Sequence, residues 1–135
     1  MTEGELLLQI AATLKREIGP AIEAEYPKTQ AFMAAVVLQK LGGQIGRAPE
    51  HQRAADADLD ALIADLSTTA LTLPLPVQRA VEALSKTRAA AALCALIESI
   101  YANRDSLGDR GFAQLLARVR KTLRAGVERR LEYAE

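Results

Sequence analysis

The chain has 135 residues, half of them hydrophobic, with no Trp, one His and one Cys. This length fits one domain, and we expect a single helical domain over residues 1–135 with a core of Leu, Ala, Ile and Val. One Cys excludes a disulfide within the chain, which fits a reducing compartment. The N-terminus lacks the basic segment of a secretory signal, and the uncharged run at 89–97 is too short to span a membrane. We therefore expect a cytoplasmic protein without membrane contact.

The net charge is zero, but the charges are unevenly spread along the chain. Residues 1–70 carry ten acids and six bases, whereas residues 71–135 carry seven acids and eleven bases. The two halves either pack through complementary faces, within one chain or between two, or the basic half meets an acidic partner. The imbalance is small, so it favours the first explanation.

The first predicted helix begins at a capping box, formed by Thr2 and Glu5 at the spacing Thr-x-x-Glu. An apolar stripe follows at helical spacing up to Ile18. Gly19-Pro20 predicts a break or kink, and a short helical piece beyond it should end at Tyr26-Pro27.

A second helix is predicted from about Thr29 to Leu41, with Gly42-Gly43 ending it and a loop at residues 46–49. A third helix should begin near Pro49 and end near Thr69. The segment Leu73-Pro74-Leu75-Pro76 is the clearest break in the chain.

The next helix is predicted from about Pro76 to Asn103, with a bend near Ser85 and a smooth surface of small residues at Ala89–Ala92. A turn at residues 105–109 precedes the last helix, whose apolar stripe runs from Phe112 to Leu131. No segment alternates with the period of a strand. The sequence therefore predicts an all-α fold, a four- to five-helix bundle in a single domain with no sheet.

The residues for several kinds of chemistry are missing. One His and one Cys exclude a zinc site of nitrogen and sulfur ligands in one chain, and no Glu-x-x-His motif for a di-metal site occurs. The glycines of residues 42–46 follow a predicted helix and lack the Lys-Ser of a phosphate loop. We expect no catalytic, metal-binding or cofactor-binding residue and no cofactor.

Two single residues and one acidic pair have structural explanations. His51 is expected to be a solvated residue at a helix start, because no catalytic partner is evident. Cys94, within an Ala- and Leu-rich run, is expected to be a small buried hydrophobe. Asp56 and Asp60 share a helix face near its N-terminus, where negative charge is favourable.

The basic side of the last helix is the candidate partner surface. Its residues are Arg118, Lys121, Arg124, Arg129 and Arg130. A nucleic-acid site is not expected, because Glu128 and Glu132 interrupt the charge and few aromatic residues accompany it.

Two segments carry a resemblance to a known family: residues 16–22, Arg-Glu-Ile-Gly-Pro-Ala-Ile, and residues 30–38, which contain Phe32. Over its first 40 residues the chain resembles a family of uncharacterised small helical bacterial proteins. Members are often encoded beside kinases similar to aminoglycoside phosphotransferases and near enzymes similar to acyl-CoA dehydrogenases. The family usually has a basic residue and a His around the aromatic, whereas here Lys28 precedes Phe32 and Met33 follows it. The resemblance implies an accessory role and carries over no catalytic residue.

Three functions stay open. We favour a non-catalytic interaction or accessory protein, either a homodimer or a partner of a metabolic enzyme such as a phosphotransferase-like kinase, with Ala89–Ala92 and the last helix as its contact surface. The second is a module that binds a small apolar or acyl-type ligand between helices. The third is an enzyme that uses only carboxylates and arginines near the Gly19-Pro20 kink, with Arg16, Glu17, Glu25 and Tyr26 converging there.

Overall fold

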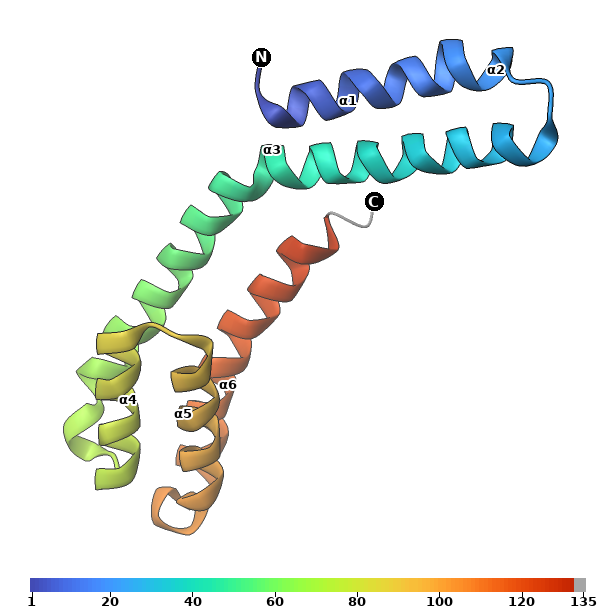
Figure 1. Ribbon diagram of the computed structural model, residues 1–135. Coiled ribbons are helices and arrows are strands. Elements are labelled where there is room, and N and C mark those ends of the chain that lie inside the picture. Colours follow the sequence, from blue (N-terminus) through green and yellow to red (C-terminus); the bar gives the residue numbers. More distant parts are fainter. Residues whose placement is uncertain (133–135) are drawn as a thin grey trace. The chain divides into compact units, whose positions relative to one another are not determined.

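The computed structural model describes residues 1–132, and these are almost entirely helical (Figure 1). The elements are α1 (Glu3–Thr13), a π-helical turn (Leu14–Ile18), α2 (Gly19–Ala21), α3 (Glu25–Thr68), a 3₁₀ turn (Ala70–Thr72), α4 (Leu75–Thr87), α5 (Ala90–Ala102) and α6 (Arg104–Leu131). No strand occurs within residues 1–132, so the predicted all-α bundle class is confirmed. None of the helices in this range has the length and apolar character needed to cross a membrane.

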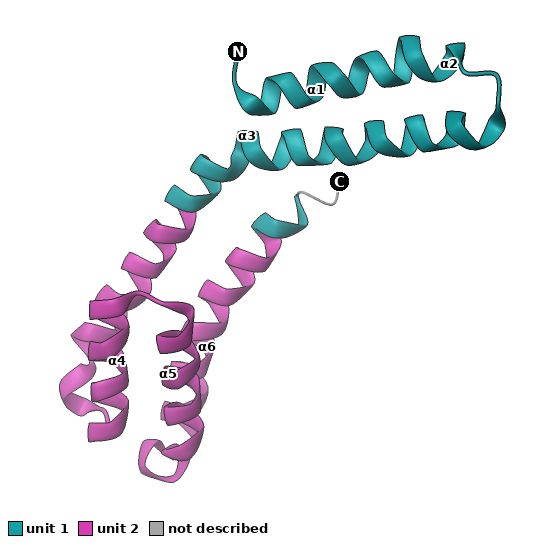
Figure 2. Cartoon of the chain, in the orientation of Figure 1, with its two compact units in different colours: residues 1–53, 129–135 teal, residues 54–128 magenta. Residues whose placement is uncertain are grey.

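The described chain divides into two compact units, coloured separately in Figure 2. Unit 1 comprises residues 1–53 together with the C-terminal residues from Arg129, and unit 2 comprises residues 54–128. Helices α3 and α6 contribute residues to both. Each unit is described by itself, and the expectation of a single domain stays a prediction.

Unit 1 is a hairpin of two antiparallel helical arms, α1 to α2 and the first half of α3 (Figure 1). The predicted capping box begins α1: the Glu5 amide donates to Thr2 Oγ1 at 3.2 Å, and the Thr2 amide donates to Glu5 Oε2 at 2.8 Å. The arms meet closely at two glycines. A Cβ placed on Gly4 would lie 2.9 Å from the Gly42 carbonyl oxygen, and one on Gly42 would lie 2.9 Å from that of Gly4. Small residues thus let the two backbones approach each other.

At the predicted break or kink of Gly19-Pro20 the structure has a π-helical turn, and the first arm continues beyond it. The Gly19 amide donates to the Leu14 carbonyl, which widens the helix into one π turn, and helical structure continues to Ala21. The helix ends at Ile22, whose backbone is extended. A Cβ on Gly19 would lie 3.1 Å from the Phe32 ring, so the two segments that carry the family resemblance pack against each other.

Helix α3 corrects three predicted boundaries. It begins at Glu25 rather than Thr29, passes through Gly42-Gly43 and Pro49 without a loop, and ends at Thr68. Pro27 lies in its first turn, where a missing N–H costs nothing. A glycine in a helix costs about 1 kcal/mol, and packing between the arms at Gly42 offsets this cost. Pro49 has no backbone N–H, so the carbonyl of Ile45 lacks its usual hydrogen bond within the helix.

Unit 2 packs the second half of α3 with α4, α5 and α6 around an apolar core (Figure 1). The predicted helix over residues 76–103 is two helices, because the chain breaks at Arg88 rather than bending near Ser85. Arg88 has the left-handed backbone (φ 54°, ψ 20°) that usually ends a helix at Gly. Its guanidinium donates to Asp60 Oδ1 at 2.6 Å and to the Asp56 carbonyl at 3.3 Å. These bonds tie the α4–α5 corner to α3.

The core of unit 2 contains only large apolar side chains. Its buried members are Leu62, Leu66, Val77, Val81, Leu84, Leu96, Ile100, Phe112, Leu115, Leu116 and Val119. Tyr101 packs edge-on against Phe112 with ring centroids 5.2 Å apart, and the Arg104 guanidinium lies 4.6 Å from the centre of the Phe112 ring. The predicted turn before the last helix is present as a non-helical residue, Gly108 (φ 75°), within α6.

Candidate functional site

The five predicted basic residues are divided between the two units. Arg118 is half-buried, and its Nε lies 3.3 Å from Asp65 Oδ2 on α3, so it serves unit 2 internally. Lys121 and Arg124 are exposed in the same unit. Arg129 and Arg130 belong to unit 1, where Arg129 is half-buried. Arg118 was expected to face a partner; its side chain is 38% exposed beside Asp65, and that expectation stays a prediction.

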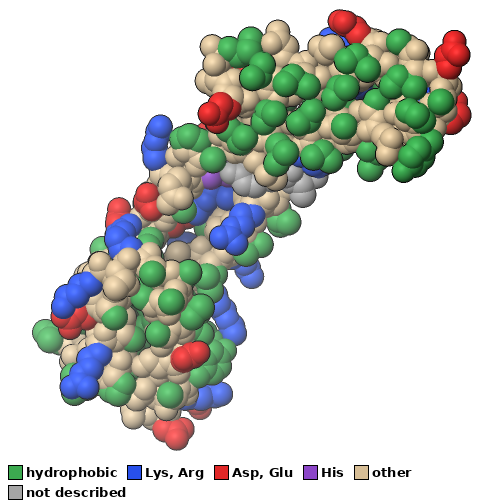
Figure 3. Space-filling view, viewed as in Figure 1, with side chains coloured by type: hydrophobic (Ala, Val, Ile, Leu, Met, Phe, Trp, Pro, Cys, Tyr) green, Lys and Arg blue, Asp and Glu red, His purple; other side chains and the backbone are tan. Residues whose placement is uncertain are grey.

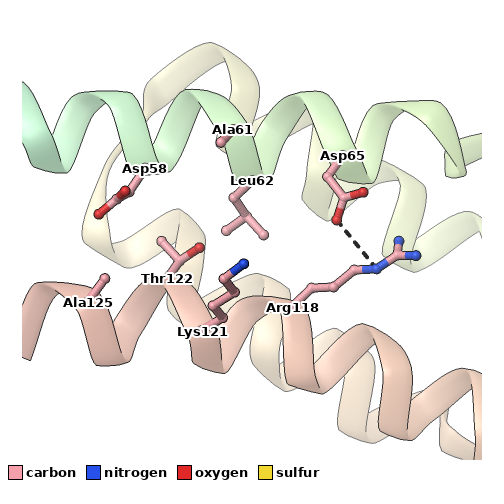
Figure 4. A pocket seen from close by; sticks show the side chains of 8 residues that line it. All are labelled: Asp58, Ala61, Leu62, Asp65, Arg118, Lys121, Thr122 and Ala125. Atoms are coloured by element: carbon pink, nitrogen blue, oxygen red, sulfur yellow. Dashed lines mark ion pairs between the residues drawn. The ribbon is translucent and has the colours of Figure 1, made fainter.

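Arg118 and Lys121 line a groove of about 460 Å³ between α3 and α6 (Figure 4). Arg118 and Asp65 point toward each other from the two helices, while Lys121 and Leu62 point into the space between them. Both signs of charge are present, and the groove is open to solvent. An enclosed apolar cavity would have supported the ligand-binding alternative, and this groove does not provide one.

His51 lies inside α3, which corrects the prediction of a solvated residue at a helix start. Its side chain is only 16% exposed, and its Nε2 lies 3.0 Å from Glu132 Oε2 in unit 1. Arg47 Nη1 donates to the Glu132 carbonyl at 3.2 Å. His51 and Arg47 therefore hold Glu132 against α3 within unit 1.

Cys94 is exposed, so the expectation of a buried thiol is wrong. Leu96 and Ile100 form the buried side of α5, and Cys94 lies two residues before Leu96. Residues two apart on a helix do not share a face. An apolar sequence context therefore misled the prediction about the direction of this side chain.

The carboxylate and arginine side chains near the first arm do not converge on a cavity. Arg16, Glu17, Glu25 and Tyr26 are all exposed, and none of them lines any of five surface pockets found within residues 1–132. Within the same range, no three His, Cys or carboxylate side chains lie close enough to hold a metal ion. A different feature of unit 1, a surface, is the stronger candidate site.

That surface is an apolar face on the hairpin of unit 1. Leu6 and Ile10 lie four residues apart on α1, and Val37, Leu41 and Ile45 lie four apart on α3. Residues at this spacing share one side of a helix. We call these five residues the apolar face; each is between 41% and 54% exposed. Figure 3 shows hydrophobic side chains gathered over α1 and the first half of α3.

The burial pattern of the two units explains why this face is notable. Within residues 1–53 every buried residue is Gly or Ala: Gly4, Ala11, Gly19, Ala35 and Gly42. Unit 2, by contrast, buries eleven large apolar side chains. Unit 1 thus has a tight seam between its arms but no core of large side chains. A helix normally covers its apolar stripe with another element, and no element among the described residues of unit 1 covers the apolar face.

The sequence contained the signal for this face, but the signal was interpreted as core. Val36-Val37, Leu41 and Ile45 follow the expected stripe of a packed helix. Only the position of the Gly and Ala seam shows that these side chains lie beside the contact between the arms and not within it.

No protein-family model, curated protein or solved structure matches the chain.

Proposed function

We propose that the chain is a non-catalytic helical interaction protein that binds another protein through the apolar face of unit 1. The observation that carries the proposal is the contrast in burial. Unit 2 has a core of large side chains, whereas residues 1–53 of unit 1 bury only Gly and Ala and leave the five side chains of the apolar face half exposed. This location differs from the contact surface expected on Ala89–Ala92 and the last helix.

The energy involved is large enough to matter. Fully burying a Leu, Ile or Val side chain is worth about 1.5–3 kcal/mol, so covering five that are half exposed would gain roughly 5 kcal/mol. That gain is comparable to the lower end of the total stability of a domain, about 5–15 kcal/mol. Scattered exposed apolar residues need no explanation, whereas a contiguous set typically marks an interaction site.

Site-specific photo-crosslinking in the native host tests this function. A photoreactive residue at Val37 should give one defined crosslinked product, and the product should disappear when Leu41→Glu is added. The same residue at Leu71, which is 94% exposed in unit 2, is the matched control and should give none. Val37 and Leu71 chains that give identical patterns, or no product at Val37, would contradict the proposal. The mass of the product separates a second copy from a different protein, including the enzyme partner that the family resemblance implies.

A further inference from the structure

We infer that the partner at the apolar face is a second copy of this chain, so that two unit 1 hairpins form an intermolecular four-helix bundle. The inference rests on the proposed function, since it assumes that the apolar face is a contact surface, and it specifies the occupant. Three properties of unit 1 point to a second copy: the size of the hairpin side that carries the apolar face, the lack of charge on the face itself, and the two-helix architecture.

The side of the hairpin that carries the apolar face is about as large as a stable dimer interface. Residues 3–21 rise about 28 Å along the first arm at 1.5 Å per residue. Two helices packed side by side are about 20 Å wide, because neighbouring axes lie 8–10 Å apart and each helix is about 10 Å across. The projected area is thus roughly 560 Å², and the side-chain relief raises its accessible area toward the ~800 Å² per partner of a standard interface.

The five residues of the apolar face carry no charge. In a two-fold symmetric dimer the same patch occurs on both subunits, so each side chain meets residues of the same patch on the other copy. A charged patch would then oppose itself, because like charges across an interface are unfavourable. An uncharged face of Leu, Ile and Val avoids this repulsion, whereas nothing in the face would select a partner of opposite charge.

The architecture completes the argument. Two antiparallel helices cannot enclose large side chains between them, and in this hairpin the space between the arms is taken by Gly4, Ala11 and Gly42. Pairing two such hairpins face to face makes a four-helix bundle, in which apolar residues from all four helices share one core. A second copy would thus give unit 1 the large-residue core that unit 2 already has.

The test is the mass of the full-length protein in solution. Sedimentation velocity over a broad range of concentrations should give twice the chain mass of 14.5 kDa for the wild type. Val37→Glu and Leu41→Glu should each raise the dissociation constant at least about 100-fold. Leu71→Glu adds the same charge at an exposed apolar residue of unit 2 and should leave the dissociation constant unchanged. Far-UV circular dichroism of each variant checks that its helices are retained.

The outcomes separate this inference from the proposed function. A wild-type protein that stays monomeric at every concentration would overturn the homodimer whatever the variants do. A dimer that survives both Glu substitutions would overturn it too, because its contact would lie elsewhere. If the wild type is monomeric while the Val37 crosslink joins a different protein, the homodimer fails and the interaction function stands. If neither dimer nor crosslink forms, both fail.

Discussion

Replacing Gly42 by Ala tests the close approach between the two arms of unit 1. A Cβ at this position would lie 2.9 Å from the Gly4 carbonyl oxygen and 3.0 Å from Leu8 Cγ. One of these atoms belongs to backbone, so the arms must move apart to admit the methyl group. Gly43 is the matched control on the same helix, because a Cβ there meets no atom within 4 Å.

The two substitutions share one favourable effect and differ in one unfavourable effect. Each replaces a helical Gly by Ala, which should stabilise the helix by about 0.5–1 kcal/mol. Only Gly42→Ala adds overpacking, which costs about 1–3 kcal/mol. The helix-propensity gain cancels in the comparison, so Gly42→Ala should be less stable than Gly43→Ala by about 1–3 kcal/mol, and Gly43→Ala more stable than the wild type.

The assay is urea unfolding of the full chain, followed by far-UV circular dichroism at one fixed protein concentration, because self-association would shift the midpoint. Hydrogen exchange of the α1 amides then shows whether the loss is local to unit 1. Gly4→Ala approaches the same contact from the other arm and should behave like Gly42→Ala. In the double variant, Gly4→Ala should lower the free energy of unfolding by less than it does in the wild type, because Gly42→Ala has already moved the arms apart. Equal stability of Gly42→Ala and Gly43→Ala would refute the close-approach argument.

Three further predictions concern unit 2. Arg88→Ala and Arg88→Gly both lose the hydrogen bonds to Asp60 and the Asp56 carbonyl. Only Gly adopts the left-handed backbone at this position without strain, so urea unfolding should show Arg88→Gly to be more stable than Arg88→Ala by about 1 kcal/mol. The pKa of Glu82 is below its ordinary value because Lys86 Nζ donates a hydrogen bond to its carboxylate at 2.9 Å and carries a positive charge. This contact therefore stabilises the fold at neutral pH, and the stabilisation is lost as the pH falls through the lowered pKa of Glu82. NMR titration should find the lowered pKa in the wild type and an ordinary one in Lys86→Met. The exposed thiol of Cys94 should react with a disulfide reagent in the native protein, and a reaction that needs denaturant would contradict its placement.

The parts of the fold that the sequence predicted depend on local interactions. The capping box of Thr2 and Glu5 needs only one helical turn, and the Pro-rich break before Pro76 acts through the backbone of neighbouring residues. The all-α class follows from apolar spacing along each segment. The buried half of the last stripe, from Phe112 to Val119, was also predicted, because its pattern has one consistent face.

The parts that could not be predicted depend on contacts between distant segments. Gly42 is a helix-ending residue by local rules, and it lies within α3 because α1 packs on it. The break at Arg88 uses a left-handed residue other than Gly, held by Asp60 from 28 positions away. Propensity and spacing carry no information about either contact, so tertiary structure overrides them.

The candidate site shows the same limit. The sequence showed an apolar stripe on nearly every helix, but it could not show which stripe would lack a neighbour. Arg118 likewise belongs to a basic stripe in the sequence, and only the structure shows that Asp65 on α3 faces it. An exposed apolar face can be identified only when the contacts of the other apolar helix faces are known.

The described residues of unit 2 enclose no polar or charged side chain. A hydrophobic core tolerates many simultaneous substitutions if the total side-chain volume and the pattern of apolar positions are kept. The core positions of unit 2 therefore require an apolar side chain of suitable size and not one particular residue. Leu, Ile and Val can therefore replace one another here over evolutionary time while the helices stay in place. The helical spacing of these apolar positions should therefore be better preserved among related sequences than the identity of each residue. Positions that do require a specific residue, such as Gly42 against Gly4, would then be the more durable signature by which descendants of this chain could be recognised.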